Sequence, residues 1–173
     1  MSDVQTLRTR ARRSSPARGG RTEKAEVVMP PITQFLKIFR ADAMTYVLFI
    51  KHGVPARTVD VMAKQMDVSK EKLFHTLGFV RTTVNRKASE DKKLTSDESA
   101  RVLGMARLVG QVQAMVEESG DPRGFDAAKW VARWLDRPLP ALGGRVPGEL
   151  MDTVDGQAML SNLLTRMQHG VYA

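Results

Sequence analysis

The sequence predicts an all-α protein. Apolar residues make up 42% of the 173 residues and aromatic residues only 6%, a balance that favours aliphatic helix packing over an aromatic-rich β-sandwich. No stretch of five or more residues alternates apolar and polar side chains as a half-buried strand does. No Asn-Gly or Asp-Gly pair marks a hairpin turn, since Asp155-Gly156 comes before a helical pattern.

The first helical segment is expected over residues 32–50. Its apolar side chains move from one helix face to another near Ala41 and Asp42, so a break is expected there. Gly53 ends the segment, and Pro55 lies just beyond it as a helix stop. The segment does not predict a membrane span, because charged side chains interrupt its apolar run: Lys37, Arg40 and Asp42.

Three short helices are expected next. The first has apolar residues at positions i, i+3, i+4 and i+7, namely Val59, Met62, Ala63 and Met66. Ser69 is expected to cap the start of the second helix, which ends at Gly78. The third helix, over residues 80–88, is mostly polar.

Two small helices braced across a tight turn fit a helix-turn-helix, whose second helix enters the DNA major groove. Either residues 69–77 form the groove helix, or they brace a groove helix over residues 80–88. The second register is preferred, because the first would turn Glu71 toward phosphate. The predicted DNA contacts are Arg81, Thr82, Thr83, Asn85, Arg86 and Lys87. The other interpretation is that they form an ordinary solvated helix face.

A long helix is expected after Leu94. Thr95 and Glu98 form a capping-box signature at its start, and Ser119-Gly120 marks its end. Its apolar stripe covers most of the helix circumference, which indicates a central helix or one at a subunit interface. The stripe is formed by Val102, Leu103, Met105, Ala106, Leu108, Val109, Val112, Met115 and Val116.

Asp121-Pro122 is expected to cap the next helix, in which Phe125 shares an apolar face with Ala128, Ala132 and Leu135. Trp130 and Trp134 on this helix are expected to belong to the core rather than to a ligand site.

Residues 137–147 predict a shaped loop, because they contain three prolines and a Gly-Gly pair. Pro147 is expected to start a short helix. Asp155 is expected to cap the final helix, whose apolar positions include Met167, and Gly170 is expected to end it. The residues that follow are largely apolar, which suggests that they dock on the protein's own core or on a partner.

The formal charge of +8 points to an anionic partner, most simply nucleic acid. Residues 1–24 carry a net +5 and the remaining residues only +3, so the basicity belongs mainly to the N-terminal segment. That segment has almost no large apolar side chains, and we expect it to be a disordered arm. Such an arm would strengthen DNA binding through phosphate contacts without specifying sequence.

Several function classes are excluded by what the sequence lacks. It has no cysteine, which rules out thiol catalysis and cysteine-based metal sites and fits a reducing cytoplasm. The three histidines are isolated, and no phosphate-binding Gly-rich loop or Gly-x-Ser-x-Gly elbow occurs. We therefore expect no catalytic residues, no metal and no cofactor.

Spaced motifs across residues 50–173 carry a family resemblance. They are Leu94-Thr95 with Glu98-Ser99, Ala128 with Trp134-Leu135, Ala141-Leu142-Gly143-Gly144 with Pro147, Leu150 with Asp152-Thr153 and Gly156, and Gly170-Val171-Tyr172-Ala173. In order and spacing the C-terminal half resembles the toxin-binding domain of the Xre/MbcA/ParS antitoxins, the partners of RES-domain and related ADP-ribosyltransferase-like toxins. The sequence departs from the family pattern at Gly148, where a larger apolar residue is usual, and at His169, where an aromatic is commoner.

The resemblance implies a basic arm over residues 1–31, an Xre-like helix-turn-helix domain over 32–93 and a toxin-binding domain over 94–173. It implies a bacterial cytoplasmic antitoxin that neutralises its toxin and represses its own promoter, as a homodimer within a larger toxin–antitoxin complex. The alternative is a stand-alone helix-turn-helix regulator whose helical C-terminal domain senses something else or oligomerises.

The toxin-binding residues implied by the resemblance are Gly143, Gly144, Arg145, Gly170, Val171, Tyr172 and Ala173. In relatives this loop and tail lie near the NAD pocket of the toxin, which makes Tyr172 and the Ala173 carboxylate candidates for blocking it. Competing structural roles are that the two loop glycines only permit a tight turn and that Tyr172 only covers its own helix.

Overall fold

A computed structural model describes residues 28–170 of the chain. The expectations for the basic arm up to residue 27 and for Val171, Tyr172 and Ala173 lie outside the described residues. Within them the protein is helical and contains no strand beyond one isolated bridge, so the predicted all-α class is confirmed.

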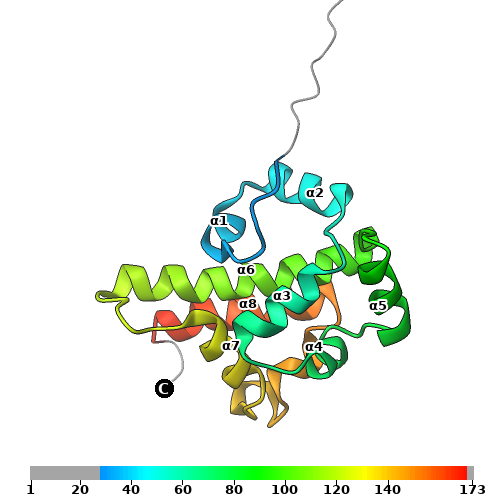
Figure 1. The fold of residues 1–173 in the computed structure, drawn as a ribbon. Helices are drawn as coiled ribbons and strands as arrows, with labels where there is room; N and C mark the ends of the chain where they lie inside the picture. Colours follow the sequence, from blue (N-terminus) through cyan, green and yellow to red (C-terminus); the bar gives the residue numbers. More distant parts are fainter. Residues whose placement is uncertain (1–27, 171–173) are drawn as a thin grey trace, which may run out of the picture.

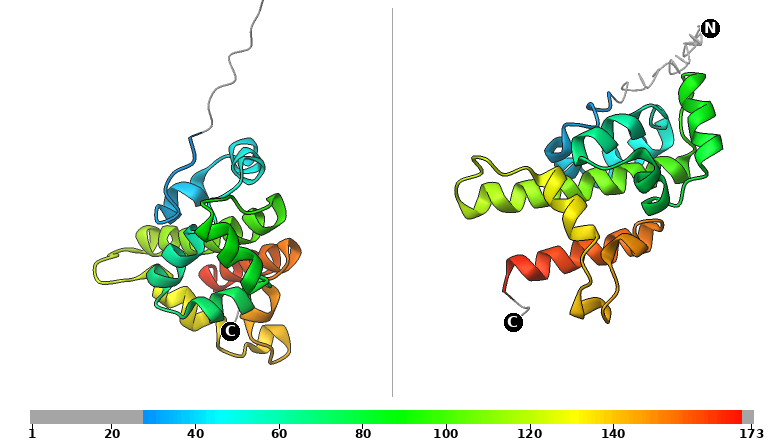
Figure 2. Two further views of the ribbon diagram at one scale, coloured as in Figure 1. Left: turned by 45° about the vertical axis from the view of Figure 1, so that its right-hand side comes forward. Right: turned by 60° about the horizontal axis from the view of Figure 1, so that its bottom comes forward.

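The long helix α6 runs through the middle of the molecule, as Figure 1 shows. Helices α1 and α2 pack on one side of it, and α7 and α8 pack on the other (Figures 1 and 2). Along the chain the α-helices are α1 (Phe35–Arg40), α2 (Ala43–His52), α3 (Thr58–Met66), α4 (Lys70–Thr76), α5 (Arg81–Ser89), α6 (Ser96–Ser119), α7 (Ala127–Leu135) and α8 (Val154–Gln168). Two 3-10 turns, η1 (Pro140–Leu142) and η2 (Pro147–Leu150), lie between α7 and α8.

The expected break in the first helical segment is confirmed. Ala41 has extended backbone angles that end α1, and the Asp42 carboxylate accepts a hydrogen bond from the Thr45 N–H to cap α2. Gly53, with a φ of 81°, ends α2. Helix α2 buries only Phe49 and leaves Met44, Val47 and Leu48 exposed, so most of its second apolar face points outward.

The core is organised around α6. The capping box predicted at its start is present in full, and the helix ends at Ser119 as expected. Its fully buried apolar side chains are Val102, Leu103, Met105, Ala106 and Val109. Gln111 ties α6 to α8, because its amide donates to the Ser161 carbonyl and to the Thr165 hydroxyl. The helix is therefore shared by both halves of the chain.

The helix start expected at Asp121-Pro122 is wrong. The Asp121 carboxylate accepts hydrogen bonds from the N–H and side chain of Arg123, which closes a local turn instead. Asp126 caps α7 through the Lys129 N–H. Phe125 precedes the helix and is more than one-third exposed, so it does not share the buried face.

The cap expected at Asp155 is also wrong. The Thr153 hydroxyl accepts a hydrogen bond from the Gly156 N–H, so α8 begins at Val154 and Asp155 stands in its first turn. The helix dipole stabilises an acidic residue in the first turn as well as at the cap. An aspartate near a helix start therefore fits either position. Met167, expected on the apolar face of α8, is exposed.

Within residues 28–170, no helix is both long enough and apolar enough to cross a membrane.

Candidate functional site

The three predicted short helices are α3, α4 and α5. All four residues predicted for the apolar face of the first are buried in α3: Val59, Met62, Ala63 and Met66. The Ser69 hydroxyl caps α4 through the Lys72 N–H, as expected. The loops that precede α3 and α6 pair through backbone hydrogen bonds, from Ala56 to Lys92 and from Leu94 to Val54. This pairing closes α3–α5 against the start of α6.

Helix α5 presents a polar outer face. Val84 is its one buried residue and anchors the helix inward. Of the predicted DNA contacts, Arg81, Thr82 and Arg86 are exposed, while Thr83 and Asn85 are half-buried. The structure therefore brings together three exposed side chains that can donate hydrogen bonds to phosphate or base edges.

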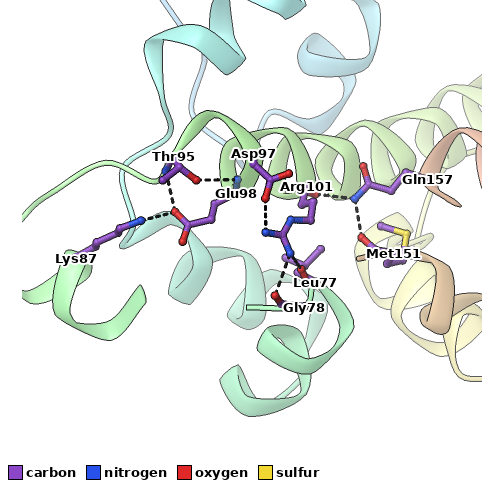
Figure 3. A network of polar contacts seen from close by, with 9 residues as sticks. All are labelled: Leu77, Gly78, Lys87, Thr95, Asp97, Glu98, Arg101, Met151 and Gln157. Atoms are coloured by element: carbon purple, nitrogen blue, oxygen red, sulfur yellow. Dashed lines mark hydrogen bonds and ion pairs between the residues drawn. The ribbon is translucent and has the colours of Figure 1, made fainter. Parts of the chain in front are cut away.

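Lys87, unlike the other predicted DNA contacts, is held in a mostly buried ion pair within the protein. Its ammonium is 2.5 Å from a carboxylate oxygen of Glu98, and its side chain is only 17% exposed. Glu98 also accepts the Thr95 N–H in the capping box (Figure 3). Burial raises the pKa of Glu98, but the hydrogen bonds from Lys87 and Thr95 outweigh it and hold the pKa below its usual value. Lys87 thus fastens the end of α5 to α6.

Helix α4 is engaged with the C-terminal half of the chain. Its Lys72 forms an ion pair with Asp136, the residue that ends α7. Helix α4 also packs against η2. Helix α4 therefore links the N-terminal helices to the C-terminal half of the chain.

The predicted loop over residues 137–147 is compact and shaped. Leu139 bridges its two ends, since its N–H donates to the Arg145 carbonyl and its own carbonyl accepts from the Gly144 N–H. Gly143 and Gly144 have φ angles of 65° and 83°, which L side chains rarely adopt. Both glycines and Arg145 are exposed. Pro147 starts η2, as expected.

The remaining predicted toxin contacts follow α8. Gly170, with a φ of 67°, comes directly after the capping residue His169 and is exposed. Figures 1 and 2 show the 137–147 loop projecting away from α6 and the end of α8 on the same side of that helix.

Sequence reasoning missed one cluster, centred on Arg101. This arginine and Gln157 are mostly buried and join α4, α6, η2 and α8 through hydrogen bonds (Figure 3). One signal could have found Arg101. It shares a helix face with Met105 and Leu108, both buried, and a charge on an apolar face needs a partner. In the part of the chain that the structure describes, no three His, Asp or Glu side chains converge as a metal site.

The geometry defines a helix-turn-helix protein with a second helical unit packed on a shared helix. Residues 47–107 match the model of the antitoxin Xre-like helix-turn-helix domain, and residues 119–170 match that of the antitoxin Xre/MbcA/ParS C-terminal toxin-binding domain. The chain belongs to the Xre/MbcA/ParS family of antitoxins.

Curated relatives agree with this assignment. The chain is 41% identical over 150 residues to a Prs ADP-ribosylating antitoxin from Sphingobium sp. (strain YBL2), covering 87% of this chain and 94% of the relative. It is 27% identical over 124 residues to an antitoxin Xre from Yersinia enterocolitica, covering 72% of this chain and 78% of the relative. The resemblance drawn from the sequence motifs is confirmed, and a toxin-binding domain implies a toxin partner.

Proposed function

We propose that this antitoxin neutralises its toxin by occluding the toxin's active site with the 137–147 loop and the residues that follow α8. The observation that carries this proposal is the exposed, preshaped loop closed by Leu139, with Gly143, Gly144 and Arg145 at its surface. A preorganised loop loses little conformational entropy on binding, which favours tight occlusion. The antitoxin itself carries no catalytic step and works in the bacterial cytoplasm.

The toxin we infer is an ADP-ribosylating, NAD-consuming enzyme, in keeping with the name of the Sphingobium relative. A pocket for NAD must hold two phosphates and a flat base. Tyr172 offers a large aromatic surface with few rotors, which suits such a pocket. Arg137 and Arg145 in the loop and Arg133 before it are exposed and would complement an acidic rim.

Co-expression with the product of the adjacent open reading frame tests this function. We expect the full-length chain to co-purify with that product and to restore growth of cells that express it. If the chain neither co-purifies with the product nor restores growth, the antitoxin does not act on that protein.

We further propose that the antitoxin represses its own operon, with α5 as the groove helix and Arg81, Thr82 and Arg86 as its main DNA contacts. Their exposure supports this role. The other predicted contacts, Thr83 and Asn85, are half-buried at the edge of the same face.

Arg86→Ala is expected to weaken binding to the promoter by about tenfold, because a lost arginine contact to a base edge or phosphate costs about 1–3 kcal/mol. A gel shift at fixed salt measures this change. Lys64→Ala, an exposed lysine on α3, serves as the matched control and should bind normally. Unchanged affinity of Arg86→Ala would reject α5 as the groove helix.

We also propose a homodimer formed through α2. Met44, Val47 and Leu48 are 69%, 42% and 37% exposed on one stripe of this helix. An outward apolar stripe is typical of an interface, and helix-turn-helix dimers bind two half-sites of an operator.

Leu48→Glu is expected to convert the dimer to a monomer, because the charge would be buried without a partner in a two-fold interface. Light scattering after gel filtration would show the molar mass fall by about half. Met159→Glu, at a 50% exposed residue of α8, should leave the mass unchanged. A parent protein that is already monomeric would contradict this interface.

A further inference from the structure

The turn between α4 and α5 is a complete Schellman motif. Gly78 takes a left-handed φ of 62°, and its N–H donates to the His75 carbonyl at 3.1 Å. The Phe79 N–H donates to the Phe74 carbonyl at 2.8 Å, and the two phenylalanine rings lie 6.4 Å apart. This motif satisfies some of the last carbonyls of α4, and the others need donors from elsewhere.

Arg101 of α6 supplies a donor for the carbonyl of the capping residue Leu77 and for that of Gly78, which follows it. Its Nη1 lies 2.6 Å from the Leu77 carbonyl oxygen and 3.0 Å from that of Gly78 (Figure 3). Its Nη2 donates to Asp97 at 2.6 Å, and its guanidinium lies 5.0 Å from the centre of the Phe79 ring. The side chain is only 13% exposed, and these contacts engage both of its terminal nitrogens.

The backbone of Arg101 faces the C-terminal half. Its carbonyl accepts the Gln157 amide at 3.1 Å, and the same amide donates to the Met151 carbonyl at 2.8 Å. A Cβ on Gly78 would lie 3.1 Å from the Arg101 Nη1 and 3.0 Å from the Asp152 Cβ. The turn therefore packs closely against α6 and the segment just before α8, although Gly78 itself is exposed.

Helix α5 begins two residues after this turn, so the turn sets where α5 starts and how it is directed. Its far end is fastened by the ion pair of Lys87 with Glu98. Both fastenings come from the first turns of α6, one at each end of α5. Neither side chain is exposed enough to reach a groove, so their effect on DNA must pass through the orientation of α5.

We infer that Arg101 is a positioning residue for DNA recognition, holding α5 at the angle that its base contacts require. This inference rests on the proposed role of α5 in promoter binding. Base-edge hydrogen bonds depend on close alignment, whereas phosphate attraction tolerates a tilted helix. Loss of Arg101 should therefore remove sequence preference before it removes DNA affinity.

The test compares Arg101→Met and Arg101→Lys with the parent on two duplexes, the promoter of its own operon and a scrambled duplex of equal length and composition. Arg107→Met is the matched control. Arg107 also stacks on an aromatic ring, 4.8 Å from the centre of Tyr46, but it lies on another part of α6 and is exposed. Toxin co-purification and thermal melting are measured on the same preparations.

We expect Arg101→Met to bind the promoter about tenfold more weakly, as expected for lost specific contacts, with unchanged affinity for the scrambled duplex and an unchanged salt slope. The promoter affinity of Arg101→Lys should fall between those of this variant and the parent. A lysine ammonium can donate to a carbonyl, but it cannot bond the carbonyls and Asp97 at once as the two arms of the guanidinium do. Toxin binding should be retained by both variants, and Arg107→Met should match the parent.

Equal loss on both duplexes would make Arg101 a direct phosphate contact and overturn the inference. An unchanged promoter preference would overturn it as well. So would a parallel loss of toxin binding and thermal stability in both Arg101 variants, since that would reduce Arg101 to a general structural residue. A parent protein that fails to distinguish the promoter from the scrambled duplex would instead overturn the proposed DNA-binding function, and the inference with it.

Discussion

Gly110→Ala is expected to lower the free energy of unfolding by about 2 kcal/mol, the range typical of overpacking a close helix contact. A Cβ at this position would overlap the Phe35 carbonyl oxygen and lie 2.7 Å from the Phe39 Cβ. The obstacle is the backbone of α1, so it cannot rotate away as a flexible side chain can. The gain in helix propensity from alanine, about 1 kcal/mol, should not compensate.

Chemical denaturation followed by circular dichroism measures this change. Glu118→Ala, an exposed residue nearer the end of α6, is the control and should stay within about 0.5 kcal/mol of the parent. If Gly110→Ala is as stable as the parent, α1 does not rest on Gly110.

Truncation after Gly170 is expected to abolish neutralisation of the toxin while leaving the fold intact. The buried residues of α8 end at Leu164, so the described core ends before the site of truncation. Loss of Tyr172 removes the aromatic group that we propose enters the toxin's pocket, and such interface anchors are typically worth about 2–4 kcal/mol.

Growth of cells that co-express the toxin measures this loss, and the melting temperature of the truncated chain provides the control for folding. Tyr172→Ala should reproduce most of the effect. Full neutralisation by the truncated chain would contradict a role for the tail and leave the 137–147 loop as the only candidate for occlusion.

Local signals in the sequence predicted the helices well, because capping is local chemistry. The hydroxyls of Ser69 and Thr95 cap the helices that follow them, and Gly53 ends the helix before it, all as expected. The errors at Asp121 and Asp155 arose where two capping residues stand close together. A side-chain hydrogen bond from Arg123 decided the first case, and that bond could not be read from spacing.

Apolar periodicity could not distinguish a core face from an outward one. Met44, Val47 and Leu48 follow a helical repeat, yet they point away from the helix α6 on which α2 packs. The repeat fixes only that the three residues share a face. Which face meets the core depends on Phe49 and on contacts with α6, which lies far along the chain.

The candidate site could be predicted only in outline for the same reason. The prolines and the Gly-Gly pair predicted the shaped loop around Gly143 and Gly144, whose positive φ angles the structure shows, but only the family resemblance implied their role at the site. The role of Arg101 depends on carbonyls 23 and 24 residues earlier in the chain and on Gln157, 56 residues later. Such a junction exists only after the helices have packed.

We propose that one chain carries two separate surfaces, α5 for promoter DNA and the loop and tail for the toxin. A crossed assay tests it most directly, measuring promoter affinity and toxin neutralisation for both Arg86→Ala and the chain truncated after Gly170. We predict that Arg86→Ala loses promoter affinity and still neutralises, and that the truncated chain binds the promoter and no longer neutralises. Loss of both activities in either variant, or of neither, would show that the two surfaces are not separate.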